Sequence, residues 1–473
     1  MTKKKRLIIL LIYAVLFFAI TPYIVLYSLG YRIDVASKRI IATGGIYVKA
    51  LPQGTDIIID SKIKNKTGLF SNTVFVQNLL PKQHAVLIQK EGYHDYQKNL
   101  LVRENQVTKL ENVVLFKQKM LFDLLEGNTD YFSTAKDNNT LLVANIETNA
   151  INFALINLTS KVKQDFFLSN EILTKAGLSL KNTKLHPDNW IIQWSNDSNK
   201  ALLTIEKSYF LLDFSLREPT ITNLAFLANS EEPSFEAQNS DYFFFIKEKN
   251  LYSSKQKLPL IKNVVTYQAA NRNITWLSLD GFLYVSDSNG RVVNKVTKQI
   301  FPIKKISSYK IINTAGLLFL QENEYLYLLN QNLGVFESFY NQVEDVKISP
   351  DGQKMIYFNQ YEILYYLLNP LRDEQSKGLL LKTTQQINDL YWLNSDYIIF
   401  KSENISKPGQ NNITIAEIDN RGDVNTINIP QVVSLLSGEH VDVNQPKIFF
   451  NHQEKKLYIL TNNQILVSEK LIP

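Results

Sequence analysis

Two serine–lysine motifs and one Lys-Thr-Gly motif are the residues of this sequence that come nearest to a catalytic set. Ser160 and Ser254 each begin an S-x-x-K motif (SKVK and SKQK), in which the lysine can activate the serine as a nucleophile. Lys66 begins a K-T-G motif, but it precedes both serines, whereas enzymes that use the two motifs carry K-T-G last. A lysine-rich chain produces such matches by chance, so we expect solvated turns at all three places.

Histidines and carboxylates are the next candidates, because they bind metal ions. His84, Glu91 and His94 lie close together in the sequence, but strand alternation gives no reason for them to converge on one ion. We therefore expect them to be solvated at the surface. Asp287 begins the sequence DSNG, which resembles the start of a calcium loop but lacks the distal glutamate, so we expect a turn there.

Further motifs that could bind or react give no site either. The five histidines (84, 94, 186, 440 and 452) contain no H-x-x-x-H pair, and the sequence has neither a G-x-S-x-G nucleophile elbow nor a glycine-rich phosphate loop. Arg421-Gly422-Asp423 matches an adhesion tripeptide, but the same residues suit an ordinary polar turn, which we favour. We expect no catalytic residue, no cofactor-binding residue, no metal ligand and no cofactor.

Composition indicates a globular protein rich in strands. The chain has 473 residues, of which 45% are hydrophobic and 11% aromatic, so it is too long for one ordinary core and too apolar to be mainly disordered. The aromatic and β-branched content favours strands over helices. Because the chain contains no cysteine, disulfides, zinc–cysteine sites and thiol catalysis are excluded, and packing alone must stabilise the fold.

The positive net charge gives little reason to expect nucleic-acid binding. The formal charge is +6, and four of these charges come from residues 3–6 (Lys-Lys-Lys-Arg), so the remainder of the chain carries +2 (6 − 4). A body that is nearly neutral releases few counter-ions from a phosphate backbone. We therefore expect no nucleic-acid partner.

The first thirty residues predict a membrane anchor. No charged residue occurs from Leu7 to Gly30, and this stretch would span about 36 Å as a helix, enough for a bilayer core with some tilt. Tyr23, Tyr27 and Tyr31 suit an interfacial belt, and the basic residues before the stretch place the N-terminus inside the cell. We predict a cytoplasmic basic tail (1–6), a transmembrane signal anchor (7–30) and a juxtamembrane linker (31–43).

A cleaved signal peptide is the alternative interpretation of the same stretch. Residues 28–30 (Ser-Leu-Gly) weakly resemble a cleavage site with small residues, but the apolar stretch is much longer than a typical signal core. We favour the uncleaved anchor. Both interpretations place the rest of the chain outside the cytoplasm.

Residues 44–116 predict a small β-sandwich. Short strands are expected at 46–50, 57–60, 73–76, 85–89, 99–102 and 107–116, with turns between them. This segment resembles the PEGA domain, through residues 52–55 (PQGT), 78–81 (NLLP), 84–88 (HAVLI) and 90–93 (KEGY). It departs from the family at Gln53 and Thr55, at Ser61 and at Lys82, where glycine is usual at the last two. The resemblance implies an extracytoplasmic location and binding of surface polymers, and it implies no catalysis.

The rest of the chain, residues 117–473, predicts a repeat array. An apolar strand recurs at 141–143, 201–203, 242–246, 274–277, 317–320, 355–358, 397–400 and 448–450, and a partner strand follows each copy. The seven intervals average about 44 residues, which is typical of β-propeller blades with four strands each. We predict a propeller of seven or eight blades, with inserted loops at 170–190 and 403–412.

One turn of the array carries a second resemblance. Ser349-Pro350-Asp351-Gly352 resembles the S-P-D-G turn of WD40-like propellers in Tol-associated and dipeptidyl-peptidase-like proteins, and residues 194–200 (WSNDSNK) are a degenerate copy. The fold expected for the chain is therefore all-β: one transmembrane helix, a PEGA-like β-sandwich (44–116) and a β-propeller (117–473).

These features predict a non-catalytic protein of the bacterial cell envelope. We expect a single-pass membrane protein with its N-terminus inside, whose extracytoplasmic propeller binds a protein or glycan partner and acts as a scaffold. The alternatives are an envelope hydrolase or lyase with a site in the propeller mouth, and a purely structural spacer. Acidic residues that meet from different blades would favour the hydrolase.

Overall fold

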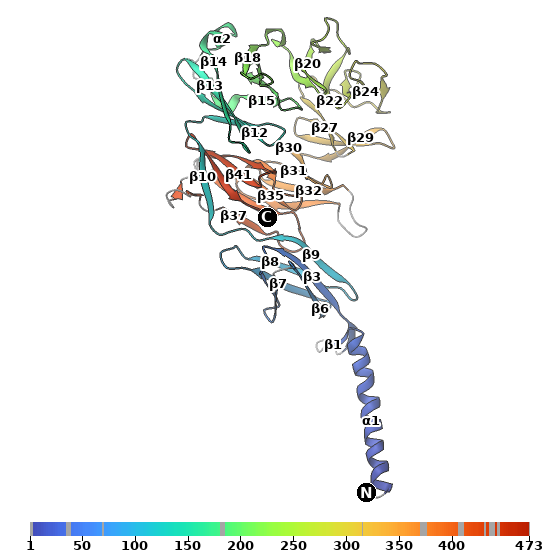
Figure 1. Ribbon diagram of the computed structural model, residues 1–473. Helices are drawn as coiled ribbons and strands as arrows, with labels where there is room; N and C mark the ends of the chain where they lie inside the picture. Colours follow the sequence, from blue (N-terminus) through green and yellow to red (C-terminus); the bar gives the residue numbers. More distant parts are fainter. Residues whose placement is uncertain are drawn as a thin grey trace. The chain divides into compact units, whose positions relative to one another are not determined.

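The chain folds into two compact units (Figure 1). This computed structural model describes residues 3–34, 39–68, 71–179, 185–314, 316–368, 376–404, 411–429, 432–434, 440–441 and 445–472. The first unit consists of Met1–Met120, Thr414–Ile429 and Leu471–Pro473, and the second consists of Leu121–Ile413 and Pro430–Lys470. Pro408 and Gly409 of the predicted loop at 403–412 lie outside the described residues.

The first unit begins with the long helix α1 (Lys3–Ser28). Its segment Lys5–Ser28 has a mean hydropathy of 2.6 and none of it is buried, so α1 is long and apolar enough to cross a membrane. The helix ends two residues before the apolar stretch does. Directly after it, in the predicted linker, β1 (Tyr31–Asp34) and β2 (Arg39–Ala42) form an antiparallel hairpin.

Two small sheets then form the predicted sandwich. One has the order β6 (Thr73–Leu79), β3 (Gly44–Leu51), β9 (Val107–Val114), and the other has the order β5 (Ile63–Lys66), β4 (Asp56–Ile59), β7 (Gln83–Gln89), β8 (Tyr96–Leu101). Alternate residues of β3, β4, β7 and β8 point inwards, as the period of two requires, and form one apolar core. Strand β5 was missed because its residues IKNK are mostly polar and exposed. Ser61, in the turn before it, has a φ of 58°, the conformation that the glycine of the family would adopt.

A buried charge network joins β8 to the segment Thr414–Ile429 within this unit. Lys98 and Glu417 form an ion pair whose two side chains are 0% and 4% exposed. Tyr96 Oη donates to Glu417 Oε2 over 2.7 Å, and Lys98 Nζ also donates to the carbonyl oxygen of Asp419 over 2.7 Å. Asn425 donates to Glu417 Oε1 through its backbone nitrogen at 3.0 Å and its Nδ2 at 2.9 Å. All the polar atoms of this ion pair therefore have partners, as burial requires.

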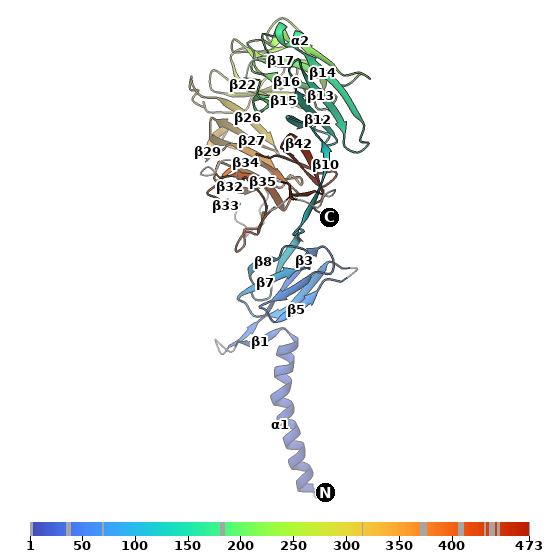
Figure 2. The ribbon, with the colours of Figure 1, turned by 90° about the vertical axis from the view of Figure 1, so that its left-hand side faces the viewer.

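Residues 120–470 form a β-propeller, as predicted, although residues 414–429 of one of its sheets are counted with the first compact unit. Among the described residues, eight antiparallel sheets follow one another along the chain (Figures 1 and 2), and the first strands of several neighbouring sheets contact each other. The sheets are β11–β14 (Tyr131–Thr134, Thr140–Ile146, Ala150–Asn157, Lys163–Ser169), β15–β18 (Ile191–Trp194, Lys200–Ile205, Ser208–Asp213, Thr220–Asn223), β19–β21 (Glu231–Glu236, Asn239–Lys247, Asn250–Ser253), β22–β25 (Val264–Ala270, Asn273–Ser278, Leu283–Asp287, Asn294–Lys295), β26–β29 (Tyr309–Thr314, Leu317–Glu322, Tyr325–Asn330, Val335–Tyr340), β30–β33 (Asp345–Ile348, Lys354–Phe358, Glu362–Leu367, Lys377–Lys382), β34–β37 (Gln386–Trp392, Tyr397–Glu403, Asn411–Glu417, Thr426–Asn428), and β40–β42 (Lys447–Asn451, Lys456–Thr461, Gln464–Lys470) with β10 (Met120–Glu126).

Strand β10 closes the ring by completing the last blade. It pairs with β42, and β38 (Val432–Ser434) and β39 (His440–Val441) extend the same sheet beyond it. One apolar cluster contains residues of both the first and the last blade, among them Leu141, Ile156, Phe449 and Tyr458. Because a strand from the start of the propeller segment completes the last blade, the first and last blades are held together and the ring is closed. The blade number of seven or eight is thereby resolved to eight for the described sheets.

In the last blade, the predicted apolar strand occupies a different position from the other seven. Seven of the predicted apolar strands are the second strands of their blades, but 448–450 lies in the first strand, β40. Phe450 is fully buried and β40 is as apolar as a second strand, which explains the error. The inserted segment 170–190 contains the short helix α2 (Asn170–Lys175) and the 3-10 turn η1 (Pro187–Asn189).

Candidate ligand-binding site

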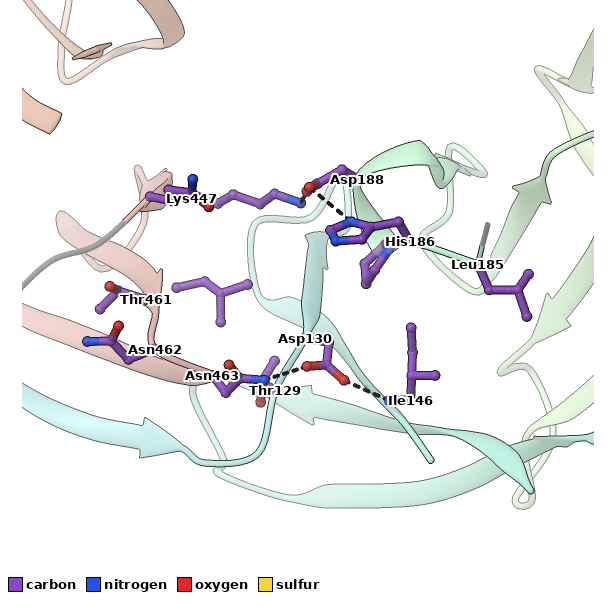
Figure 3. A pocket seen from close by; sticks show the side chains of 13 residues that line it. Thr129, Asp130, Ile146, Leu185, His186, Asp188, Lys447, Thr461, Asn462 and Asn463 are labelled. Carbon is purple, nitrogen blue, oxygen red and sulfur yellow. Dashed lines mark hydrogen bonds and ion pairs between the residues drawn. The ribbon is translucent and has the colours of Figure 1, made fainter. Parts of the chain in front are cut away.

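A pocket of about 600 Å³ lies in the second unit, over the last and first blades of the propeller (Figure 3). This volume is within the range of small-ligand sites. Four segments line it: the turn before β11, the β12–β13 turn, the segment around η1, and the last blade. The lining residues are Thr129, Asp130, Ile146, Leu185, His186, Pro187, Asp188, Gln445, Lys447, Leu460, Thr461, Asn462 and Asn463.

Asp130 forms one corner of the pocket and ties the first blade to the last (Figure 3). Its carboxylate accepts hydrogen bonds from Asn463 Nδ2 and from the backbone nitrogen of Ile146, the latter at 2.8 Å. Asn462 and Asn463 have φ angles of 48° and 56°, so they form the tight asparagine turn that joins two hairpin strands. The backbone nitrogen of Thr129 donates to the carbonyl of Asn463 over 2.9 Å. This corner therefore presents fixed amide and carboxylate groups.

An ion pair between Asp188 and Lys447 forms another wall (Figure 3). Lys447 Nζ lies 2.5 Å from Asp188 Oδ1, and His186 Nδ1 lies 3.1 Å from Asp188 Oδ2. The hydrogen bond from Lys447 lowers the pKa of Asp188, so this carboxylate is charged at neutral pH. Its side chain is 59% exposed and that of Lys447 35%, so both remain accessible to a ligand.

A further lysine and two tyrosines lie near this wall, on the first strands of their blades. Lys447 Nζ lies 5.4 Å from the ring centroid of Tyr131, and Lys347 Nζ lies 5.7 Å from that of Tyr391, both within cation–π range. Burial raises the pKa of Tyr131 to about 12 and also raises the pKa of Tyr391. Both phenols therefore stay neutral and can donate hydrogen bonds at physiological pH.

Asp389 is the most unusual carboxyl group near this wall. It occupies a bulge of β34 with a φ of 45°, in the left-handed region where aspartate is enriched among non-glycine residues. Burial raises the pKa of Asp389, although Lys401 and Lys447 act in the opposite direction. The bulge thus turns one carboxyl group of raised pKa towards the lysines of the neighbouring strands.

None of these residues was predicted from the sequence to form a site. His186 was counted only as one of five histidines, and the break in the repeat at 170–190 was the one signal for Asp188. Asp130 and Asn463 are 333 positions apart in the chain, so no local pattern could have paired them.

The serine–lysine and Lys-Thr-Gly motifs have structural roles. Lys163 pairs with Glu126 at 3.1 Å, and Ser254 Oγ accepts a hydrogen bond from the backbone nitrogen of Phe243 at 2.9 Å. Thr67 is buried, not solvated as expected, and its Oγ1 accepts from the backbone nitrogen of Thr55 at 2.8 Å. The prediction of a solvated turn is therefore wrong for Thr67.

The turn motifs at Asp287 and Arg421 also have structural partners. Asp287 Oδ1 accepts hydrogen bonds from the backbone nitrogens of Asn289 and Arg291, at 3.0 and 2.7 Å. Arg421 forms an ion pair of 2.6 Å with Asp419, so its guanidinium is already occupied. In both places these contacts stabilise a turn.

His84 contradicts the expectation of a solvated histidine. It is 2% exposed, its Nδ1 lies 2.7 Å from Asp60 Oδ2, and its Nε2 lies 2.8 Å from the carbonyl oxygen of Leu80. His84 faces the core because it lies two positions before Val86 in β7, and residues two apart in a strand share one face. His94 is half-buried, with its Nε2 atom buried, whereas Glu91 is exposed as expected. In the described part of the chain no three metal-binding side chains converge.

The Asp60–His84 pair predicts an acid-dependent stability of the sandwich. Burial alone would raise the pKa of Asp60, but hydrogen bonds from His84 and from the Ala85 amide lower it below 3.8. A carboxylate with a lowered pKa stabilises the fold above its unfolded pKa, and this contribution is lost as the pH falls through the folded pKa. We expect Asp60→Asn to lower the free energy of unfolding by about 1 kcal/mol at pH 5, and by less at pH 2.5. Urea unfolding at both pH values measures this, and Asp56→Asn, whose carboxylate pairs with the exposed Lys64, is the control. An equal loss at both pH values would contradict the role of the Asp60 charge.

Comparison with known proteins confirms the resemblance for one part of the chain. Residues 43–115 match the PEGA domain family. No curated protein matches the sequence. Solved structures also match, at low sequence identity.

Three of these structures illustrate the match. The Cps50 (Swd1) β-propeller domain of Myceliophteria thermophila is 11% identical and has a TM-score of 0.39, with 73% of this chain and 97% of that chain covered. The WD40 domain of SCAP from fission yeast is 12% identical with a TM-score of 0.40, covering 75% and 99%. YCF48 from Cyanidioschyzon merolae is 11% identical with a TM-score of 0.36, covering 59% and 95%.

Proposed function

We propose that this chain is a non-catalytic glycan-binding protein of the bacterial cell envelope. Helix α1 holds it in the cell membrane with the N-terminus inside, and the propeller binds a short saccharide segment of a surface polymer in the pocket between the last and first blades. The observation that carries the proposal is the pocket itself, in which Asp130, Asp188 and Lys447 lie fixed beside amide and hydroxyl side chains.

The size and chemistry of the pocket favour a saccharide over a folded protein partner. A stable protein interface buries about 800 Å² on each side, whereas a concave pocket of about 600 Å³ suits a small ligand. Sugar hydroxyls both donate and accept hydrogen bonds, and the pocket offers acceptors in Asp130 and donors in Lys447 and the asparagine amides. A peptide segment of a protein partner is the second ligand class to test.

Membrane anchorage rests on α1 and on the composition around it. The helix is apolar, four basic residues stand at its N-terminal end, and the positive-inside rule then directs the following chain outwards. A PEGA domain followed in the chain by a propeller favours a binding or scaffolding role in an extracytoplasmic location.

Two carboxyl groups support a hydrolase as the second candidate. Lys447 lies near both Asp188, whose pKa is lowered, and Asp389, whose pKa is raised, and such a divergence is typical of acid and base pairs in glycosidases. However, Asp389 does not line the pocket and accepts a hydrogen bond from the backbone of Ile448. We therefore favour binding, and we expect Asp389→Asn to leave saccharide affinity unchanged.

Charge reversal of the Asp188–Lys447 pair tests the proposal. We expect Lys447→Asp to weaken saccharide binding about tenfold, equivalent to about 1.4 kcal/mol, because it removes a donor and places two carboxylates together. Adding Asp188→Lys restores the ion pair with exchanged partners and should recover part of the affinity. The measurement is titration of the full chain in nanodiscs against a panel of bacterial-surface oligosaccharides and short peptides.

A matched control lies outside the pocket. Lys175 and Glu171 form an exposed pair on α2, so Lys175→Asp changes the same charge without touching the pocket. Equal affinities of the Lys447→Asp and wild-type chains would contradict the proposed site, and new reducing ends would support the hydrolase instead.

A further inference from the structure

The hairpin β1–β2 has one apolar face and one charged face. Residues directly opposite each other in an antiparallel pair point to the same side, and the register pairs Ile33 with Ile40 and Tyr31 with Ala42. The same register pairs Arg32 with Ile41 and places Arg39 on their side of the hairpin. One face therefore carries Tyr31, Ile33, Ile40 and Ala42, and the other carries the two arginines together with Ile41.

The apolar face is open in the folded chain. Ile33 and Ile40 are each 56% exposed and Tyr31 is 36% exposed, although an isolated two-stranded hairpin is at best marginally stable in water. Two β-branched side chains that face each other across a hairpin and remain exposed indicate a surface that is covered by something outside this chain.

The hairpin is tied to the last turn of α1. Only Leu29 and Gly30 separate helix and strand, and two residues reach at most about 7 Å. The Arg32 guanidinium lies 3.5 Å from the ring centroid of Tyr27 and donates to the carbonyl oxygens of Tyr27 and Tyr31, each at 2.8 Å. Directly after β2, the backbone nitrogen of Thr43 donates to the carbonyl oxygen of Gly30 over 3.0 Å. Both ends of the hairpin are thus fixed to the end of the helix.

We propose that the β1–β2 hairpin lies in the interfacial layer of the membrane, with Ile33 and Ile40 at the boundary of the acyl chains and Arg39 towards the lipid phosphates. This inference rests on the membrane anchorage proposed above for α1. An amphipathic element lies in the interface in this way when apolar and basic side chains occupy opposite faces, and tyrosine is enriched at the same depth. The hairpin would then fix how deeply α1 lies in the membrane and where the sandwich begins relative to the membrane surface.

The absence of cysteine makes the test direct, because each introduced cysteine is the single label site in the chain. Nitroxide labels are placed at Ile33→Cys, Ile40→Cys and Arg39→Cys in the full chain, in nanodiscs of phosphatidylcholine and phosphatidylglycerol. Power saturation with oxygen and with a water-soluble nickel complex gives the depth of each label. Leu16→Cys in the middle of α1 reports the anchor, and Leu101→Cys, an exposed position of β8, reports water.

We expect the labels at Ile33 and Ile40 to have several-fold lower nickel accessibility than the label at Leu101, and the neighbouring label at Arg39 to be more accessible than that at Ile40. Labels at Ile33 and Ile40 that match Leu101, with a deep label at Leu16, would overturn the hairpin inference and leave the anchor in place. A water-exposed label at Leu16 would overturn the anchor and the hairpin inference together.

Discussion

Lys98→Met is expected to lower the free energy of unfolding of the first unit by about 3–5 kcal/mol, the usual cost of removing one partner from a buried ion pair. Glu417 would keep its hydrogen bonds from Tyr96 and Asn425 but lose its counter-ion in a site where it is 4% exposed. Hydrogen exchange of the full chain measures the effect. The amides of β8 and of residues 414–429 should exchange faster together.

Two further variants separate the ion pair from the loss of a side chain. Lys64→Met removes a lysine of the same unit that pairs with Asp56 but is 62% exposed, and we expect less than about 1 kcal/mol there. The double variant Lys98→Met with Glu417→Leu removes both charges and should regain much of the loss. An effect of Lys98→Met as small as that of Lys64→Met would show that the buried pair does not hold these segments together.

Phe122→Ala should destabilise the propeller by about 3–5 kcal/mol, because it leaves a cavity in the strand that closes the ring. Phe122 is 1% exposed and lies opposite Ser468 in the pairing of β10 with β42. Urea unfolding monitored by the fluorescence of the tryptophans, all of which lie in the second unit, measures the change.

Leu124 in the same strand provides the control. It lies opposite Leu466 and is 50% exposed, so Leu124→Ala keeps the strand and should change the free energy of unfolding by only about 0.5 kcal/mol. Similar losses for the two variants would mean that closure depends on the backbone of β10 and not on the packing of Phe122.

The strands were predictable because most of them follow elementary periodicities. The apolar runs at 201–203 and 355–358 are buried second strands, β16 and β31, and their recurrence predicted the blades. The same rule failed at 448–450, because β40 is a first strand that the last blade buries as fully as a second strand. Apolarity therefore predicts burial of a strand better than it predicts the position of that strand within a blade.

The polar residues were harder to predict, although alternation contained part of the signal. His84 lies on the same face of β7 as Val86 and Ile88, and Lys98 on the same face of β8 as Tyr96 and Leu100. Both positions therefore face inwards. Their partners are Asp60, in the turn after β4, and Glu417, in β36, and neither could be predicted from local sequence. The pocket was still harder to predict, because Asp130 and Asn463 contact each other only when the ring closes and the last blade packs against the first.

Hydrogen exchange of the full chain with and without soluble bacterial-surface oligosaccharides, followed by analysis of the sugars, decides whether the pocket binds a saccharide without cleaving it. We expect slower exchange confined to residues 185–190, 445–447 and 461–463, with the oligosaccharides recovered intact. Unchanged exchange in all three segments, or shortened oligosaccharides, would contradict the proposed function.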